Sequence, residues 1–396
     1  MTTNSYPILI FLSSIVIVSY IFNLFSRRWK FPSVLFLLGL GIVLRYLSIY
    51  LGFEIGNIQP YLELFGIVGL ILIVLEAALD IKISPSTLPI VKKSLEVAFL
   101  VLVLSVGAIA SLFHFWFSVG WFRACLNAIP LAVISSAIVI PSVDHLSHKK
   151  KEFLIYESTL SDILGILAFN FLLQHPVAKI SSAFHFIGSL TVTIMLSVVS
   201  SLLLIYLIAR IKDHVKIFII LSVMIIIYSF GKLWHLSPLL LIFVFGILLS
   251  NFEFFFKKRF TSLTNGPIDK EFSEFKLVAS ESSFVIRTFF FVMFGYSIDL
   301  VALASWEVLF TGSAVVIVLL LVRYLYLKFI AKIDVFPELY ISPKGLVSIL
   351  LFYSIQPELL IPSVSRSVLF YVICVSAMIM SVAILKDHRK SLKGAV

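Results

Sequence analysis

The sequence predicts an all-α polytopic membrane protein with thirteen transmembrane helices. Three observations lead to this prediction: 60% of the 396 residues are hydrophobic, only 13% are charged, and the mean hydropathy is +1.10. Soluble domains contain about 45–50% apolar and about 25% charged residues. A soluble protein of this composition would have too few polar side chains to cover its surface, which excludes that class.

The composition also argues against other classes of protein. The longest polar stretch, residues 253–276, still contains seven Phe or Leu residues, so we expect no soluble domain. Cys125 and Cys374 are the two cysteines and show no CxxC or zinc-type spacing, which argues against a disulfide framework and a structural metal. The basic residues are scattered in short loops between apolar runs, so the net charge of +10 indicates membrane topology and no nucleic-acid partner.

The thirteen predicted spans are apolar runs of about 20 residues, the length that a helix needs to cross the hydrocarbon core. Glycine, proline, asparagine and charged residues separate these runs. In chain order, the predicted spans are residues 6–25, 32–51, 61–79, 95–117, 124–143, 152–174, 184–209, 215–231, 237–252, 281–297, 306–327, 338–355 and 365–385.

The basic residues of the loops test that number of spans. The segments after odd-numbered spans contain 23 Lys and Arg residues, whereas the alternate loops contain four: Arg123, Lys179, Lys232 and Arg366. Lys and Arg concentrate on the cytoplasmic side, so the asymmetry predicts an N-terminus outside and a C-terminus inside. Merging or splitting one span would move every later loop to the other side and remove the asymmetry.

Four basic residues lie within the predicted spans: Arg45, Arg287, Arg323 and Lys344. An embedded charge costs about 2.5–3.5 kcal/mol on insertion scales, so four unpaired charges would cost roughly 10 kcal/mol, as much as a protein's net stability. We therefore expect partners or water at these positions. Glu281 is the expected partner of Arg287, and the sequence names none for Arg45.

Span 6 carries the acid best placed for ion binding. Asp162 lies ten residues past Glu152, about 15 Å along a helix and near the midplane of a core about 30 Å thick. Ser158 lies one turn away on the same face, and Ser161 is adjacent. Carboxylate and hydroxyl oxygens suit a small, hard cation. The alternative is that Asp162 pairs with a buried base, or stays protonated and serves helix packing.

Glu157 and Arg323 are predicted to form an ion pair. Each lies about 7 Å from the inner end of its span, at 1.5 Å per residue. Opposite charges at equal depth can neutralise each other's insertion cost. The pair either contributes to transport or acts as scaffold alone.

Spans 5 and 12 are predicted to be interrupted helices. Each combines small residues with a proline: Ser135, Ser136 and Pro141 in span 5, and Pro343, Lys344 and Gly345 in span 12. Proline removes a helical hydrogen bond, and two interrupted helices in opposite orientations indicate a midplane site between inverted repeats. Lys344 is expected either to offset the negative end of a half-helix or to extend to the inner surface.

The predicted organisation is one transmembrane transporter domain over residues 1–396. Two inverted six-helix repeats, approximately residues 6–174 and 215–385, are joined by a linker helix at residues 184–209. Spans 5 and 12 are seven spans apart, and this odd separation gives them the opposite directions that an inverted repeat requires.

Several stretches resemble the monovalent cation:proton antiporter superfamily, and the sodium/proton exchangers in particular. In chain order they are LEAALDIKIS, SSAIVIPS, ESTLSDILGI, RTFFFVMFGYSID, LLVRYL and SPKGLVSI, in spans 3, 5, 6, 10, 11 and 12. The resemblance covers nearly the whole chain and includes that family's thirteen-span, inverted-repeat fold with crossed, interrupted helices.

The resemblance implies a secondary transporter, not an enzyme, that exchanges Na⁺ (or K⁺ or Li⁺) for H⁺ without a cofactor. It implies that Asp162 carries both ions and that Glu157 and Arg323 form the ion pair of electroneutral exchangers. Lys344 is the charge that the residues of span 12 place at the second helix break. It also implies a homodimer in membrane lipid whose core domain moves against a dimerisation domain. The candidate monovalent-cation ligands are Asp162, Ser161, Ser158, Ser136 and Ser135.

Two departures from the family pattern leave the transported cation open. Ser161 stands where electroneutral members have Asn and electrogenic members have a second Asp, and Ser135-Ser136 replaces a Thr-Asp pair. One carboxylate among several hydroxyls has less negative charge than the usual site. A K⁺/H⁺ antiporter of the potassium-efflux branch is therefore the alternative to Na⁺/H⁺ exchange.

A cation channel and a non-transporting membrane protein are the alternatives from other classes. A channel needs a filter of carbonyls or a ring of like charges, and the sequence contains no TVGYG-like filter or acidic repeat. HExxH, GxSxG and Walker motifs are absent, which argues against an intramembrane enzyme. With no long cytosolic tail, a multi-pass protein of the bacterial inner (plasma) membrane is expected.

Overall fold

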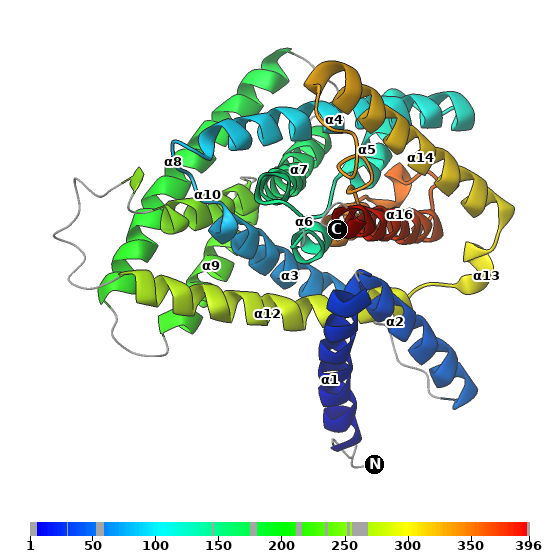
Figure 1. Ribbon diagram of the computed structural model, residues 1–396, viewed down its shortest axis with the longest axis horizontal. Coiled ribbons are helices and arrows are strands. Elements are labelled where there is room, and N and C mark those ends of the chain that lie inside the picture. The colour runs from blue at the N-terminus through cyan, green and yellow to red at the C-terminus, as the bar shows by residue number, and fades with distance from the viewer. Residues whose placement is uncertain are drawn as a thin grey trace.

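The computed structural model is helical, with no β-strand among the residues that it describes. The described residues are 6–29, 31–52, 59–144, 146–174, 180–210, 216–233, 237–251, 254–255 and 268–393. Figure 1 shows long helices that cross one another, with α6, α7 and α16 near the centre of the view. An all-helical fold is therefore confirmed over these residues.

The helices follow the apolar runs of the sequence. The N-terminal part contains α1 (Tyr6–Trp29), α2 (Ser33–Tyr50), α3 (Gln59–Asp80), α4 (Leu88–Phe117), α5 (Trp121–Ala132), α6 (Ser136–Ser142), α7 (His148–Gln174) and α8 (Ile180–Arg210). The C-terminal part contains α9 (Lys216–Leu233), α10 (Pro238–Ser250), α12 (Ile268–Tyr296), α13 (Leu300–Leu303), α14 (Trp306–Leu325), the π-helical turn η2 (Tyr326–Ala331), α15 (Leu346–Tyr353), the 3₁₀ turn η3 (Pro357–Leu359) and α16 (Arg366–Lys393).

Each of the thirteen predicted spans overlaps a helix. Among the described residues, eight helical segments are long and apolar enough to cross a membrane. Three shorter apolar helical segments accompany them, at Leu190–Leu204, Phe218–Leu233 and Pro238–Ser250. Local signals mark some helix ends: the Ser305 hydroxyl caps α14 by accepting a hydrogen bond from the Val308 amide at 3.4 Å.

The predicted interruption of span 5 is present, but Pro141 does not cause it. Helix α5 ends at Ala132, residues 133–135 are non-helical, and α6 begins at Ser136. Pro130 lies inside α5 and Pro141 lies inside α6, so neither proline is at the break. The break is stabilised by contacts with other segments of the chain.

Span 12 is interrupted more extensively than predicted. Residues 338–345, the first part of that span, are non-helical. Helix α15 begins only at Leu346 and contains eight residues. The non-helical part of this span runs beside the break of span 5, because the Ser135 amide donates a hydrogen bond to the Pro343 carbonyl.

The helices pack into two groups, which we call the α7 group and the α3 group. The α7 group consists of α4, α5, α6, α7, α14, α15 and α16, and the α3 group consists of α1, α2, α3, α8, α9, α10 and α12. Helix α3 contacts α7 and α15 and thereby joins the groups. In Figure 1, α8 follows the left edge and α12 lies below, whereas α14 lies to the right. Each group takes helices from both halves of the chain.

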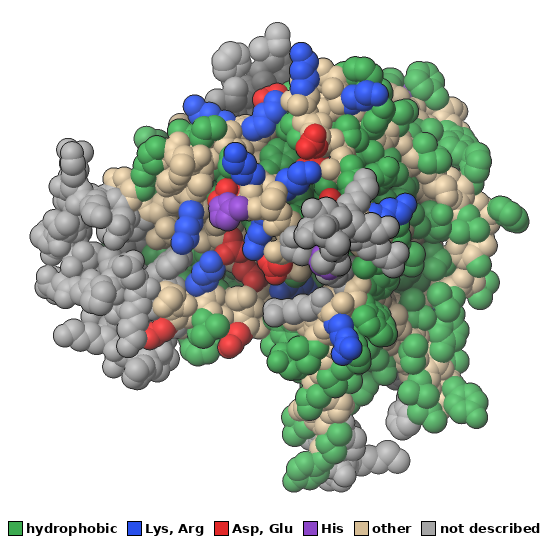
Figure 2. Space-filling model, in the orientation of Figure 1, with side chains coloured by type: hydrophobic (Ala, Val, Ile, Leu, Met, Phe, Trp, Pro, Cys, Tyr) green, Lys and Arg blue, Asp and Glu red, His purple; other side chains and the backbone are tan. Residues whose placement is uncertain are grey.

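One face of the molecule is strongly polar. Figure 2 shows Lys, Arg, Asp and Glu side chains over the centre of this face, while hydrophobic side chains cover its right and lower flanks. Apolar side chains on helix flanks, such as Val199 on α8 and Ile317 on α14, are exposed. Exposed apolar flanks beside a charged end are typical of helices surrounded by lipid.

Candidate functional site

Asp162 is buried in α7 with one of its two carboxylate oxygens held by α6. Oδ2 accepts hydrogen bonds from the backbone N–H of Ser136 at 3.0 Å and from its hydroxyl at 2.5 Å. Oδ1 is also buried but has no hydrogen-bond partner, and the side chain is only 3% exposed. Half of this carboxylate is therefore positioned, and the other half is available to a ligand.

The break between α5 and α6 is stabilised by two hydrogen bonds from its backbone. The Ile134 amide donates to the Ser161 hydroxyl at 3.0 Å, and the Ser135 amide donates to the Pro343 carbonyl at 2.9 Å. The second bond joins the two interrupted spans directly. Ser135 Oγ is buried and unpaired, so a second oxygen without a partner lies beside the residue that holds Asp162.

The two interrupted segments pass so closely that a side chain at Gly345 would not fit. A Cβ atom there would overlap Ser135 Oγ and lie 2.7 Å from Ser135 Cβ. Gly165 allows a similar approach on α7, because a Cβ at that position would overlap the Val133 side chain. These glycines let α7, the α5–α6 break and the residues before α15 meet around Asp162.

Lys344 lies at the end of α5 and does not extend to a surface. Its ammonium donates to the Ala132 carbonyl at 2.8 Å, and Ala132 is the last residue of α5. A cation at a helix C-terminus interacts favourably with the negative end of the helix dipole. Of the two arrangements that the sequence allowed, the surface position is wrong, because Lys344 is only 2% exposed.

Glu157 and Arg323 form the bidentate contact that their equal depth predicted. The two nitrogen–oxygen distances are 2.5 and 2.9 Å, and both residues are 1% exposed. Arg323 also donates to the Glu338 carbonyl through Nε at 3.0 Å and Nη2 at 2.9 Å. The contact ties α7 to α14 and to the segment before α15, while its role in transport stays a prediction.

Most of the candidate cation ligands are brought together. Ser136 donates hydrogen bonds to Asp162, and the Ser161 hydroxyl accepts one from the backbone of the α5–α6 break. Ser135 directly precedes Ser136, and its amide donates to the Pro343 carbonyl. Ser158 differs, because its hydroxyl donates to the Ile155 carbonyl of its own helix at 3.1 Å and makes no hydrogen bond to Asp162.

The expected pairing of Arg287 with Glu281 is wrong. Residues six apart on a helix lie on different faces, because helical neighbours are three or four residues apart. Arg287 Nη2 instead lies 3.9 Å from Glu76 Oε2 on α3, and Nη1 donates to the Ala137 carbonyl of α6 at 3.4 Å. Arg45, for which no partner was predicted, donates to the Tyr296 carbonyl at 3.5 Å.

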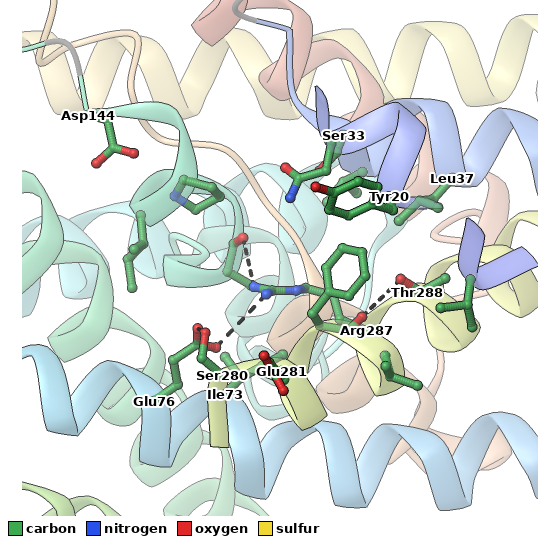
Figure 3. Close-up of a pocket in the computed structure, with 18 residues that line it drawn as sticks. Tyr20, Ser33, Leu37, Ile73, Glu76, Asp144, Ser280, Glu281, Arg287 and Thr288 are labelled. Atoms are coloured by element: carbon green, nitrogen blue, oxygen red, sulfur yellow. Dashed lines mark hydrogen bonds and ion pairs between the residues drawn. The ribbon is translucent and has the colours of Figure 1, made fainter. Parts of the chain in front are cut away.

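Two cavities lie between the α7 group and the α3 group. The first, about 560 Å³, is the Arg287 cavity; among its lining residues are Glu76, Ala137, Asp144, Ser280, Glu281 and Arg287. Figure 3 shows the Arg287 side chain projecting into it, with dashed lines to Glu76 and to α6. The second, about 520 Å³, has Glu63, Asn170, Lys232 and Tyr353 among its lining residues. Glu63 and Glu76 are about 20 Å apart along α3, so the cavities lie near opposite ends of the interface.

Sequence reasoning missed two acids at this site. Glu76 lies inside predicted span 3 and carries the same signal, an embedded acid, that identified Asp162. Glu338 is 2% exposed and pairs with Lys150 at 3.2 Å. Glu338 lies at the start of predicted span 12, and no local pattern indicates a partner so distant in the chain.

The chain is similar to known transport proteins over nearly its whole length. The family profile described as sodium/hydrogen exchanger, transmembrane, matches residues 12–385. A structure of the sodium proton antiporter MjNhaP1 from Methanocaldococcus jannaschii at pH 8 aligns with a TM-score of 0.70 over 95% of both chains. An electron-microscopy structure of the same antiporter aligns with a TM-score of 0.71 over 98% of both chains; identity is 17% in each case, so the likeness shows the fold alone. No curated protein matches the chain by sequence.

Replacing Glu157 by Gln is expected to destabilise the protein by about 3–5 kcal/mol, because Arg323 would keep its buried charge without a counter-charge. The measurement is thermal unfolding of the purified protein in detergent. Lys151→Gln is the control, since Lys151 pairs with Asp144 at 2.8 Å in an exposed position worth about 0–1 kcal/mol. Equal melting temperatures for Glu157→Gln and wild type would refute the role of Glu157 as the stabilising counter-charge of Arg323.

Replacing Gly345 by Ala is expected to separate the two interrupted segments and to cost about 1–3 kcal/mol, as overpacking in a tight interior does. The transport rate of Gly345→Ala is expected to fall together with its stability. Gly107→Ala on α4 is the matched control, because a Cβ there meets no atom within 4 Å. The same unfolding assay compares the two variants, and a Gly345→Ala protein as stable as Gly107→Ala would contradict the close crossing.

Proposed function

The chain belongs to the sodium/hydrogen exchanger family, and we propose that it exchanges a monovalent cation, Na⁺ in the first place, for H⁺ through Asp162. As a member of that family it is a membrane transporter and not an enzyme. The observation that carries the proposal is the unpaired, buried Oδ1 of Asp162 beside an Oδ2 held by Ser136. A buried acid in an apolar helix bundle is by default a functional-site hypothesis.

The proton and the cation compete for this one carboxylate. Asp162 Oδ1 and Ser135 Oγ are the unpaired oxygens, and the hydroxyls of Ser136 and Ser161 lie at the same break. Oxygen ligands of this kind suit Na⁺, Li⁺ or K⁺, so the exchange needs no cofactor. A proton on Asp162 removes the negative charge that binds the cation, and a bound cation leaves no room for the proton.

Exchange in this scheme is electroneutral. One positive charge moves in each direction, while Glu157 and Arg323 neutralise each other through two short contacts. Lys344 stays at the C-terminal end of α5, bound to the Ala132 carbonyl. Neither fixed base needs to gain or lose a proton during the cycle.

The proposed motion shifts the α7 group against the α3 group. Asp162 belongs to the α7 group, and the two cavities lie near opposite ends of the interface between the groups. A shift of one group past the other would connect Asp162 first to one cavity and then to the other. The sparse contact of α3 with α7 and α15 favours such a shift.

The proposed topology has thirteen spans, with N-terminus outside and C-terminus inside, in a single domain over residues 1–396. The inverted repeats are residues 6–174 and 215–385, and α8 contains the linker at 184–209. A helix at each of the thirteen ranges and the charged face in Figure 2 support this arrangement. We further propose a homodimer in the bacterial inner membrane, in line with the family resemblance.

Transport in liposomes tests the exchange and names the cation. Purified protein is reconstituted with an internal pH dye, and Na⁺, K⁺ and Li⁺ are added in separate pulses with the membrane potential clamped or free. Proton movement that is equal in both conditions supports electroneutral exchange, and the most active ion identifies the substrate. A response to K⁺ alone would favour the K⁺/H⁺ alternative, and no response to any cation would refute antiport.

Asp162→Asn is expected to abolish this proton movement, at least 100-fold below wild type, because a neutral amide cannot exchange a proton for a cation. The variant should still elute as a folded protein with a melting temperature near that of wild type. Asp299→Asn is the matched control, since Asp299 caps α13 at an exposed position outside the site. Wild-type transport by Asp162→Asn would rule out the mechanism.

A further inference from the structure

The Arg287 cavity reaches the backbone of α6 next to Ser136, the residue that binds Asp162. The positively charged guanidinium of Arg287 lies at this end of α6. Arg287 Nη1 donates to the Ala137 carbonyl at 3.4 Å. Ala137 directly follows Ser136, whose amide and hydroxyl bind Asp162 Oδ2. The guanidinium therefore lies one residue away from the group that positions the proposed ion carrier.

Arg287 connects the two helix groups at this position. It is carried by α12 in the α3 group, and it binds α6 in the α7 group. Glu76, which also belongs to the α3 group, lies 3.9 Å from Arg287 and accepts a hydrogen bond from the Ser280 hydroxyl at 2.7 Å. Glu76 is thus oriented toward Arg287 from one side, while Ala137 binds it from the other.

The cavity is lined by charges of both signs. Three acids, Glu76, Asp144 and Glu281, and one base, Arg287, are its charged lining residues. Asp144 is highly exposed, whereas Arg287 is only 17% exposed in its side chain. The acids favour cations in the cavity, and the arginine repels them where it contacts the Ala137 carbonyl of α6. Charges in such a partly buried site are screened less than in bulk water.

We propose that Arg287 is a gate for the transported cation: its guanidinium occupies the route from the cavity to Asp162 and must leave the Ala137 carbonyl for the cation to pass. This inference rests on the proposed exchange at Asp162 and adds a positioning residue that sets the apparent cation affinity. The cation competes with a tethered positive charge, so its apparent affinity is lower than that of the open site.

A purely structural role for Arg287 makes a different prediction. If the residue only joined α12 to α6, its loss would lower the melting temperature and the maximal rate and leave the KM for the cation unchanged. If it acts as a gate, removal of its charge lowers KM, and a positive charge of similar reach restores it. The ratio of KM to kcat and the effect of a conservative variant separate these roles.

The experiment compares wild type, Arg287→Gln, Arg287→Lys and Asp162→Asn in liposomes, with NaCl replaced by choline chloride at constant ionic strength. Arg287→Gln keeps a polar side chain and loses the charge, so its KM for Na⁺ is expected to fall about tenfold, equivalent to about 1.4 kcal/mol. Arg287→Lys is expected within about twofold of wild type. An unchanged or raised KM in Arg287→Gln, or the same fall in Arg287→Lys, overturns the gate.

A binding measurement keeps the gate and the exchange distinguishable. The rise in melting temperature with NaCl, against choline chloride, gives the half-saturating Na⁺ concentration in detergent without transport. If wild-type liposomes move no protons, the proposed exchange is wrong. The gate is then supported if the half-saturating Na⁺ concentration of Arg287→Gln is about tenfold below that of wild type, and it is wrong if the two concentrations are equal. If none of the proteins is stabilised by Na⁺ or transports it, both proposals are wrong.

Discussion

The fold depends on the meeting of two non-helical segments in the interior of the helix bundle. Backbone groups in a membrane interior have no water to bind, so an interrupted helix must find partners within the protein. The Ser135 amide uses the Pro343 carbonyl, and the Ile134 amide uses the Ser161 hydroxyl. Lys344 binds the free carbonyl of Ala132 at the end of α5. Each interruption is stabilised by the segment that crosses it, and α7 passes beside both.

That arrangement also creates the proposed ion site. A continuous α5–α6 helix would use its own amides internally, and Ser136 N–H would not be free to hold Asp162 Oδ2. Because the helix is broken there, a carboxylate can be buried with one oxygen bound and the other unpaired. The remaining buried charges compensate one another or bind carbonyls, as Glu157 and Arg323 do beside the Glu338 carbonyl. The buried Glu157–Arg323 pair thus lies near a carboxylate, that of Asp162, which keeps one unpaired oxygen.

The sequence identified the main ionisable residues but not all their partners. Depth along a span located Asp162 and matched Glu157 with Arg323, because rise per residue is nearly constant in a helix. The sequence pairs Arg287 with Glu281 on its own helix, whereas Glu76 on α3 is the nearby acid. The interruption of span 5 was attributed to Pro141, yet it occurs at residues 133–135. Contacts between helices distant in the chain have no local signal.

The sequence by itself determined that this is a membrane protein of the exchanger family, helical over the described residues, with an acid in the sixth of its apolar ranges. Hydropathy and charge asymmetry act along the chain, so they can be read from it. Only the tertiary structure decided where Lys344 and Arg287 bind and which oxygens remain unpaired. It also separated the helices into two groups with cavities between them. These features arise from packing between distant segments, where a close approach such as Gly345 on Ser135 depends on three-dimensional fit.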